Sequence, residues 1–264
     1  MNHSLLWEIL KGNGNSQGFL FGTMHVKDSR ALDLTSVALS KFSEVDALFL
    51  ELDPKEVGPD IMMQALKLPE GVHLPDLYSA NQYSRIKNKL LKYAQLNLDY
   101  FAEYIPMYVA NTVYESMVSS DYKYPMDLMF YHRAKESGME VYGLETMEEQ
   151  LEKIEGVTLN EQAGALRDLS RRFFSHKNKL DRLFEYYVSQ DIHGLYSLNK
   201  KQLGPLRKAF LYERNFIMAD RIMERLNDRK AFIAVGAAHL SGKYGLIRLL
   251  KVGGYRLKPV NHIN

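Results

Sequence analysis

The stretch Asp46-Ala-Leu-Phe-Leu-Glu-Leu-Asp53 decides the fold class of this chain. Its continuous apolar run is typical of a strand that is covered on both faces, as the strands of a parallel sheet are. A shorter apolar run, Phe19–Gly22, lies upstream, and a helical pattern over about 35–42 separates the two runs. Strand, helix and strand predict a βαβ unit with a right-handed crossover, whose strands end at the same edge of a parallel sheet.

Further strands are predicted toward both ends of the sequence. Leu5–Leu10 and Phe19–Gly22 flank a cluster of turn-forming residues, which predicts a hairpin. Glu140–Glu145, Ala231–Gly236 and Tyr255–Val260 are the remaining predicted strands. We therefore expect an α/β fold with a mixed, mostly parallel central sheet, built from N- and C-terminal βαβ-like halves.

The segments between these strands have helical patterns. Three pairs of residues have the spacing of capping boxes, which start helices: Ser79 with Gln82, Thr146 with Glu149, and Thr158 with Glu161. We predict large helical insertions at about 57–137 and 147–228. No Pro-, Ser- or Gly-rich linker divides the chain, so a single domain over 1–264 is expected.

The composition excludes several classes of protein. The chain has 264 residues, 46% apolar and 25% charged, as compact soluble proteins have. Its 34 basic and 32 acidic residues give a formal charge of +2, which predicts no nucleic-acid partner. The absence of cysteine excludes disulfides, thiolate nucleophiles and Cys-bound metals. Neither a signal peptide nor an apolar run of ~20 residues is evident, so we expect a cytoplasmic protein without membrane insertion.

Two short motifs have the same form. Gly22-Thr-Met-His25 and Gly236-Ala-Ala-His239 each follow a predicted strand, with glycine at the strand end and histidine three positions later. Ligands of open α/β sheets bind along the carboxyl edge of the strands, where these histidines are expected. Taken singly, either histidine has the alternative interpretation of a hydrogen-bonded structural residue.

Two glutamates are predicted to lie at the same edge. Glu51 and Glu145 end predicted strands, so their carboxylates would converge with His25 and His239. Two imidazoles with carboxylates and no thiolate form a site that suits Mn²⁺, Co²⁺, Zn²⁺ or Fe²⁺. Such an ion could activate a water molecule or polarise a carbonyl group. The sequence contains neither a phosphate-binding loop nor a G-x-S-x-G nucleophile elbow.

Five motifs occur in order along nearly the whole chain: Gly22-Thr-Met-His25, Phe49-Leu-Glu-Leu-Asp53, Tyr142-Gly-Leu-Glu-Thr146, Glu213-Arg-Asn215 and Val235-Gly-Ala-Ala-His-Leu-Ser-Gly242. Together they resemble the TraB/PrgY/GumN family, which includes the Tiki Wnt-cleaving proteases. The resemblance implies a fold of the erythromycin-esterase and ChaN-like kind. It also implies a metallopeptidase activity that favours Mn²⁺ or Co²⁺ and acts on a peptide or protein substrate.

The resemblance also implies roles for particular residues. His25, His239 and one of the two glutamates, Glu51 and Glu145, would bind the metal, and the other glutamate would act as general base; which glutamate does which stays open. Arg214 and Asn215 match the family's Arg-Asn pair. Arg214 would hold a substrate carboxylate or stabilise an oxyanion, with a structural Arg–Glu pair as the alternative.

Two other functions are also compatible with the sequence. The chain could sequester a peptide without cleaving it, with Tyr- and Met-rich helices as the groove. Pheromone-shutdown members of the family reduce the activity of secreted peptides, and the motifs leave open whether they cut or capture them. A tetrapyrrole-binding role follows only from the similarity to ChaN-like proteins. The chain shows no secretory or lipid-anchoring segment and no C-terminal membrane spans of the kind known in relatives, so we expect its substrate to differ from theirs.

Overall fold

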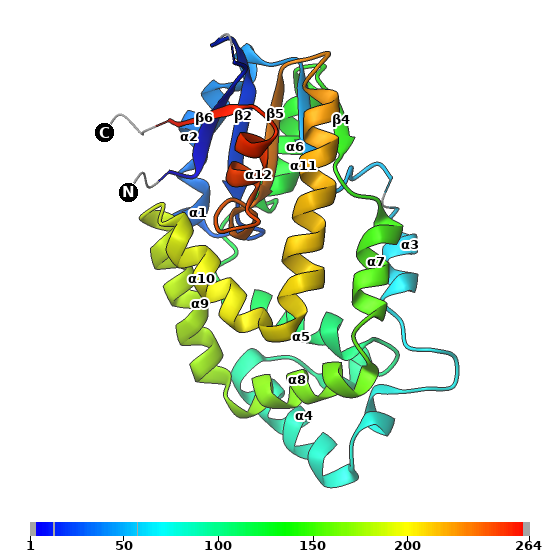
Figure 1. Ribbon diagram of the computed structural model, residues 1–264. Helices are drawn as coiled ribbons and strands as arrows, with labels where there is room; N and C mark the ends of the chain where they lie inside the picture. The colour runs from blue at the N-terminus through cyan, green and yellow to red at the C-terminus, as the bar shows by residue number, and fades with distance from the viewer. Residues whose placement is uncertain (1–3, 13, 57, 261–264) are drawn as a thin grey trace. The chain divides into compact units, whose positions relative to one another are not determined.

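The computed structural model describes residues 4–12, 14–56 and 58–260 of the chain. They form two compact units. The sheet unit comprises Met1–Glu56, Ser120–Glu149 and Arg182–Asn264, and the helical unit comprises Val57–Ser119 and Gln150–Asp181. Figure 1 shows the sheet unit, with several of its strands labelled. Within the described ranges, no helix has the length and apolar character needed to cross a membrane.

The described part of the sheet unit contains a six-stranded sheet in the order β4-β3-β5-β2-β1-β6. Its strands are β1 Leu6–Leu10, β2 Ser16–Thr23, β3 Ala47–Leu50, β4 Glu140–Gly143, β5 Ala231–Gly236 and β6 Arg256–Pro259. The pairs β2–β5, β5–β3 and β3–β4 are parallel, whereas β1 is antiparallel to β2 and to β6. The predicted α/β class and the mixed, mostly parallel sheet are confirmed.

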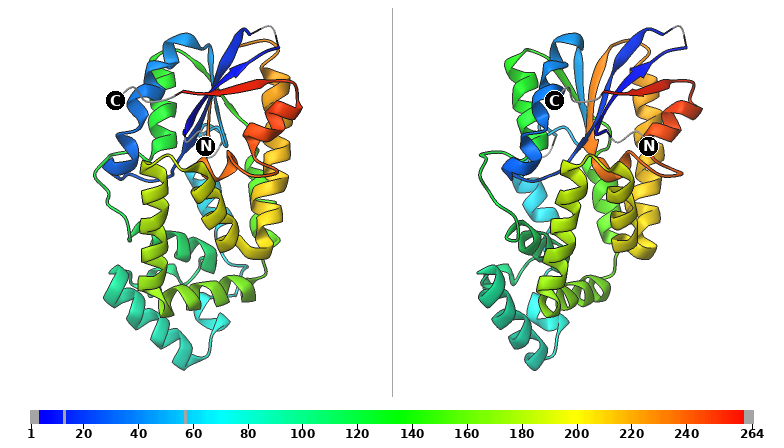
Figure 2. Two further views of the ribbon diagram at one scale, coloured as in Figure 1. Left: turned by 60° about the vertical axis from the view of Figure 1, so that its left-hand side comes forward. Right: turned by 90° about the vertical axis from the view of Figure 1, so that its left-hand side faces the viewer.

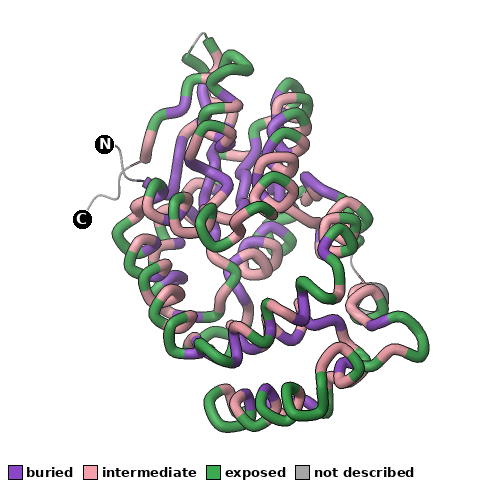
Figure 3. The backbone as a smooth tube through the Cα atoms, turned by 60° about the horizontal axis from the view of Figure 1, so that its bottom comes forward, coloured by how far each residue is buried: buried purple, intermediate pink, exposed green. Residues whose placement is uncertain are grey.

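The predicted hairpin and the predicted parallel strands occur, but one adjacency was not foreseen. β1 and β2 form the hairpin, and β2 and β3 run parallel in one sheet. β5, from the C-terminal part of the chain, lies between β2 and β3 and pairs with both. Its residues Ala231 to Val235 are all buried, because strands cover both of its edges and helices both of its faces. Figure 3 shows these central strands as buried.

Helices cover both faces of this sheet, as Figure 2 shows. On one face lie α1 Ser29–Leu32, α2 Thr35–Ser40, the 3₁₀ turn Phe42–Glu44 and α6 Met126–Glu136, and on the other lie α11 Arg214–Arg225 and α12 Leu246–Val252. Phe42 stacks on Phe130 of α6 with ring centroids 5.7 Å apart, and Phe232 of β5 lies 4.9 Å from Phe42. Burying such aromatic side chains stabilises each by roughly 1.5–3 kcal/mol, which fixes α6 on β5.

The long helical region that precedes β5 is divided. The predicted helix from Thr158 toward Gln190 consists of α8 Leu159–Arg171 and α9 Phe173–Val188, which Arg172 separates. α10 Ile192–Leu203 follows, then a π-helix over Lys208–Glu213 that leads directly into α11. π-Helical turns occur preferentially at functional sites, and this one ends immediately before Arg214.

The helical unit contains α3 Pro59–Ala65, α4 Ala80–Ala94, α5 Pro106–Glu115 and α8, and α7 Met147–Glu155 connects the sheet unit to it. Two predicted capping boxes start α4 and α8: Ser79 Oγ accepts from Gln82 N at 3.3 Å, and Thr158 Oγ1 accepts from Glu161 N at 3.3 Å. The buried residues of this unit form its own core, which includes Leu90 and Val109. Most of the partly buried aromatic and methionine side chains there pack against that core rather than form a free surface.

Candidate active site at the carboxyl edge of the sheet

Four of the six predicted site residues follow the carboxyl ends of parallel strands. Glu51 comes directly after β3 and Glu145 two positions after β4. His239 ends the 3₁₀ turn Ala237–His239 that continues β5, and His25 lies two positions after β2. Because these four strands are parallel, all four residues lie at the same edge of the sheet, as the sequence predicts.

The two glutamates are linked through the backbone. The N–H of Glu145 donates to the carbonyl oxygen of Glu51 at 2.8 Å, and the N–H of Leu144 donates to the carbonyl oxygen of Leu50 at 2.8 Å. These hydrogen bonds extend the β3–β4 pairing past the end of both strands. The extended pairing holds the two carboxylates beside each other although their residues lie far apart in the sequence.

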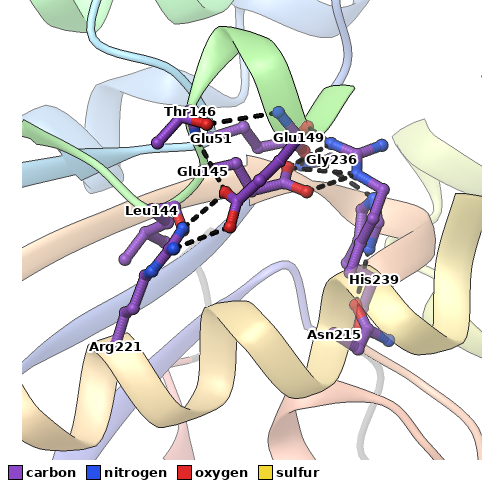
Figure 4. A network of polar contacts seen from close by, with 10 residues as sticks. Glu51, Leu144, Glu145, Thr146, Glu149, Asn215, Arg221, Gly236 and His239 are labelled. Carbon is purple, nitrogen blue, oxygen red and sulfur yellow. Dashed lines mark hydrogen bonds and ion pairs between the residues drawn. The ribbon is translucent and has the colours of Figure 1, made fainter. Parts of the chain in front are cut away.

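Arg214, at the start of α11, binds both carboxylates. Its Nε lies 2.8 Å from Oε1 of Glu145 and its Nη2 lies 2.6 Å from Oε2, which makes a bidentate pair. The same Nη2 donates to Oε2 of Glu51 at 2.5 Å. The other oxygen of Glu51, Oε1, accepts from the N–H of Gly236 at 2.7 Å. Figure 4 shows how Glu51, Glu145 and Gly236 meet in this network.

The charges of this cluster shift several pKa values. Burial alone would raise the pKa of Glu51, but the attraction of Arg214 and His239, with the hydrogen bonds from Gly236 and Arg214, lowers it to about 2. Burial disfavours the charged form of Arg214, yet the two glutamates raise the pKa of its guanidinium. Two carboxylates therefore share one guanidinium, which leaves the cluster with a net negative charge that attracts a cation.

His239 is a neutral imidazole whose tautomer follows from its neighbours. Burial is the largest cause that lowers its pKa to about 4; Glu51 opposes this effect and Arg214 adds to it. Nδ1 lies 2.5 Å from Oδ1 of Asn215, whose Nδ2 donates to the carbonyl oxygen of Tyr244 at 2.7 Å. Since that amide oxygen can only accept, Nδ1 carries the proton and Nε2 presents a lone pair.

The lone pair of His239 faces Glu51. Nε2 lies 3.8 Å from Oε1 of Glu51 and makes no hydrogen bond with any residue of the described ranges. Two ligands that each bind one ion at ~2.0–2.2 Å lie roughly 3–4 Å apart, so this separation fits a divalent metal. Metal-binding histidines also donate their other ring N–H to a fixed acceptor, as His239 does to Asn215. Among the described residues, no group of three or more His, Asp or Glu side chains is arranged to hold an ion.

One polar contact of His25 lies outside this network. Its Nδ1 lies 2.7 Å from Oδ2 of Asp127 in α6, and its side chain is 68% exposed. The structure therefore brings together Glu51, Glu145, Arg214, Asn215 and His239, and places His25 at the same edge of the sheet with a different carboxylate as partner. Asp127 was not singled out in the sequence, where nothing in its spacing relates it to His25.

A second arginine of α11 holds the segment that carries Glu145. Arg221 donates to the carbonyl oxygen of Leu144 at 2.8 Å and to both carboxylate oxygens of Glu149 at 2.7 Å, as Figure 4 shows. Glu149 also closes the predicted capping box by accepting from the N–H of Thr146 at 2.8 Å. Arg214 and Arg221 are seven positions apart, which is about two helical turns. This spacing is the signal in the sequence that places both arginines on one face of α11.

The glycines of the two G-x-x-H motifs are needed for close approach. A Cβ at Gly22 would lie 2.7 Å from Cδ1 of Leu240 and 3.0 Å from Cα of Ala237. A Cβ at Gly236 would lie 3.2 Å from Oε1 of Glu51. Gly22 is not among the described glycines with positive φ, and Gly236 has a φ of −52°. At both positions glycine is needed because a Cβ would collide with neighbouring atoms, and not because the backbone has a positive φ.

The fold and the site define the class: an α/β protein with a charged site at the carboxyl edge of its sheet. Comparison with known proteins shows the family. The TraB/PrgY/gumN family matches residues 5–259. The chain belongs to this family. No solved structure matches it.

Several curated relatives carry the name of a protease. The chain is 24% identical to Metalloprotease TIKI2 of Danio rerio, over 97% of this chain and 61% of that protein. It is 23% identical to Metalloprotease TIKI2 of Xenopus tropicalis, over 97% and 60%, and 22% identical to Metalloprotease TIKI1 of Homo sapiens, over 97% and 62%. The chain thus spans about three fifths of the length of these relatives.

Proposed function

We propose that this chain is a metal-dependent peptidase that cleaves a peptide or protein substrate at the carboxyl edge of its sheet. The observation that carries the proposal is the neutral imidazole of His239, whose Nε2 faces the Glu51 carboxylate at 3.8 Å within a negatively charged cluster. The names of the relatives support the same activity. A bound Mn²⁺ or Co²⁺, or else Zn²⁺ or Fe²⁺, would polarise the scissile carbonyl and acidify a water molecule.

The contacts of the two glutamates support different roles for them. The Glu51 side chain is 27% exposed and directs Oε1 toward His239, which suits a metal ligand. The Glu145 side chain is 1% exposed and binds Arg214 through both oxygens, which suits a residue that positions the guanidinium. His25 is the proposed third ligand. Its Nδ1 contacts Asp127, so Nε2 is the ring nitrogen that would bind the ion.

Arg214 has a donor available for the substrate. Its Nη1 makes no hydrogen bond with any residue in the described part of the chain, and no fully buried side-chain nitrogen or oxygen lacks a partner there. Nη1 is therefore reachable from solvent. A guanidinium held by two glutamates is oriented before the substrate binds, so it can donate to a substrate carbonyl or carboxylate without losing further side-chain freedom.

Metal binding is tested first, because it needs no known substrate. The chain is stripped with EDTA, loaded with equimolar Mn²⁺ or Co²⁺, desalted and assayed by elemental analysis and calorimetry. We expect one ion per chain in the wild type, and loss of the ion in Glu51→Gln and His239→Gln. His73→Ala is the matched control, because the exposed His73 side chain lies in the helical unit. A wild type that binds no ion, or two site variants that both retain it, contradicts the proposal.

Peptide cleavage is tested next with a library of internally quenched fluorescent peptides. We expect turnover that EDTA stops and Mn²⁺ or Co²⁺ restores. Glu145→Gln should retain the ion and lose turnover, whereas Glu51→Gln should lose the ion itself. The opposite result for the two variants would exchange their roles. Turnover that persists in EDTA would exclude a metal-dependent reaction.

Peptide binding without cleavage is the second candidate function. It is favoured by the absence, among the described residues, of a group of three metal-binding side chains, and by the pairing of both glutamates with Arg214. On this alternative, fluorescence anisotropy detects saturable binding of a library peptide to the EDTA-treated chain, and mass spectrometry finds the peptide intact after incubation with Mn²⁺.

A further inference from the structure

A cavity of about 550 Å³ lies within the sheet unit, lined by elements other than those that carry the glutamates. Its walls come from β1, β6, α12, the start of α10 and the segment 240–242. Figure 1 shows α12 and β6 near each other, and these two elements are in contact. Cavities that bind small molecules typically enclose ~300–1,000 Å³, so this one is large enough for a ligand.

Apolar side chains form most of the cavity wall. They are Trp7, Ile192, Leu240, Ile247 and Leu257. The indole N–H of Trp7 already donates to the carbonyl oxygen of Ser4 at 2.9 Å, so Trp7 offers the cavity an aromatic face and no hydrogen bond. A ligand that fills this space must therefore have an apolar body.

Two cations line the same cavity, and no described residue neutralises either of them. Arg248 and Lys251 lie three positions apart on α12, which places them on one face of that helix. Neither forms an ion pair with any carboxylate of the described residues, and Lys251 Nζ lies 5.9 Å from the centroid of the Trp7 ring. Among the residues that the structure describes, the cavity lining contains no Asp or Glu. Its charge is therefore positive and complements an anion.

A buried serine and a histidine add a hydrogen-bond donor. Oγ of Ser241, a residue only 4% exposed, lies 2.7 Å from Nδ1 of His193, and both residues line the cavity. If the hydroxyl donates to Nδ1, the Nε2–H of His193 remains as a donor. If Nδ1 donates instead, the serine hydroxyl keeps its own proton. Either arrangement leaves one donor for an anionic ligand.

We propose that this cavity binds a small molecule in which one carboxylate is joined to an apolar body. The apolar wall takes the body, while Arg248 and Lys251 take the carboxylate. A fatty acid and the carboxyl end of an apolar peptide share this chemistry. The site does not depend on the proposed peptidase activity, because none of its residues belongs to the network of Glu51, Glu145, Arg214, Asn215 and His239.

Trp7 provides a direct measurement, because it is the only tryptophan of the chain. Decanoate is titrated below its micelle concentration while Trp7 emission is recorded, with decan-1-ol as the uncharged analogue. We expect a saturable change with decanoate and binding of the alcohol that is weaker by about tenfold, the loss expected for a charge-assisted contact at a partly exposed site. The absence of a saturable change, or equal affinity for acid and alcohol, overturns the proposal.

Two double variants test whether decanoate binding depends on the cations of the cavity or on positive charge elsewhere on the surface. Arg248→Gln with Lys251→Gln should weaken decanoate binding by about tenfold or more and leave decan-1-ol binding unchanged. Both side chains are exposed, so the variant should fold. Arg256→Gln with Lys258→Gln is the matched control, since these exposed residues flank Leu257 on β6 and point to the other face of the sheet. An equal loss in the control pair overturns the proposal.

Competition with N-acetyl-leucyl-phenylalanine identifies the source of the carboxylate. If the dipeptide displaces decanoate and its C-terminal amide does not, the ligand is the carboxyl end of a peptide. If neither displaces decanoate, the ligand is a free fatty acid. Displacement by the amide and the acid alike would mean that the carboxylate is not recognised, which overturns the proposal.

Discussion

Nδ1 of His239 donates to Oδ1 of Asn215 across 2.5 Å, and this hydrogen bond decides which nitrogen of the imidazole is available for chemistry. The amide of Asn215 cannot rotate freely, because its Nδ2 donates to the carbonyl oxygen of Tyr244. Asn215 is buried at 1% exposure in the first turn of α11, next to Arg214. One turn of one helix therefore orients the imidazole through Asn215 and both glutamates through Arg214.

Replacing Asn215 by leucine should let the His239 ring adopt both neutral tautomers. The change removes the acceptor of Nδ1–H in a buried environment, which costs about 1–3 kcal/mol of the free energy of unfolding. Nitrogen-15 NMR of the histidine rings should show a single Nδ1–H tautomer in the wild type and a mixture in Asn215→Leu. Asn227→Ala, at an exposed position, is the control. An unchanged tautomer in Asn215→Leu would mean that another group fixes the ring.

Replacing Arg214 by methionine should strongly destabilise the sheet unit. Glu51 and Glu145 would lose their shared counter-ion, and breaking a buried ion pair from one side costs roughly 3–5 kcal/mol. Urea unfolding measures this loss. Adding Glu145→Gln to Arg214→Met should recover part of it, because one of the unpaired charges is removed. Equal losses in the single and double variants would contradict the expected recovery, and the Glu145→Gln single variant completes the cycle that gives the coupling energy of the pair.

Acid should destabilise the EDTA-treated chain in two steps. In the unfolded chain His239 binds a proton near pH 6.5, but in the folded chain only near pH 4, so the free energy of unfolding falls as the pH drops between these values. Glu51 protonates near 4.5 when unfolded and near 2 when folded, so a further fall follows between pH 4.5 and 2. Each step is on the order of 3 kcal/mol.

Urea unfolding at a series of pH values measures both steps. His239→Gln should remove the step between pH 6.5 and 4. It should reduce the lower step without removing it, because Arg214 still lowers the pKa of Glu51 when the attraction of His239 is lost. The slopes are compared, rather than the absolute free energies, because the variant also changes packing. A wild-type chain whose stability is constant from pH 6.5 to 4 would contradict the neutral, buried state of His239.

Replacing Gly22 by alanine should force β2 away from the 3₁₀ turn that carries His239. The new Cβ would lie 2.7 Å from Leu240 and 3.0 Å from the backbone of Ala237, and overpacking of this kind costs about 1–3 kcal/mol. Gly12→Ala is the matched control, since nothing lies within 4 Å of a Cβ at that position. Thermal unfolding compares the two variants. Equal melting temperatures would show that the strand end tolerates a side chain.

The sequence by itself determined the features that depend on near neighbours along the chain. The apolar runs around Phe49 and Ile233 predicted buried strands, because burial on both faces needs apolar residues at every position. The capping boxes at Ser79, Thr146 and Thr158 predicted helix starts, because the cap and its partner are only three residues apart. Strand ends also placed His25, Glu51, Glu145 and His239 at one edge.

Only the tertiary structure decided which of these side chains meet. Arg214 reaches Glu51 across 163 residues of sequence and Glu145 across 69, and β5 enters between β2 and β3 although it comes last of the parallel strands. Contacts between residues this far apart in the sequence depend on how whole helices and strands pack, and the periodicity of the sequence carries no information about that packing. For the same reason the sequence could not show that His25 pairs with Asp127, or that Asn215 orients His239.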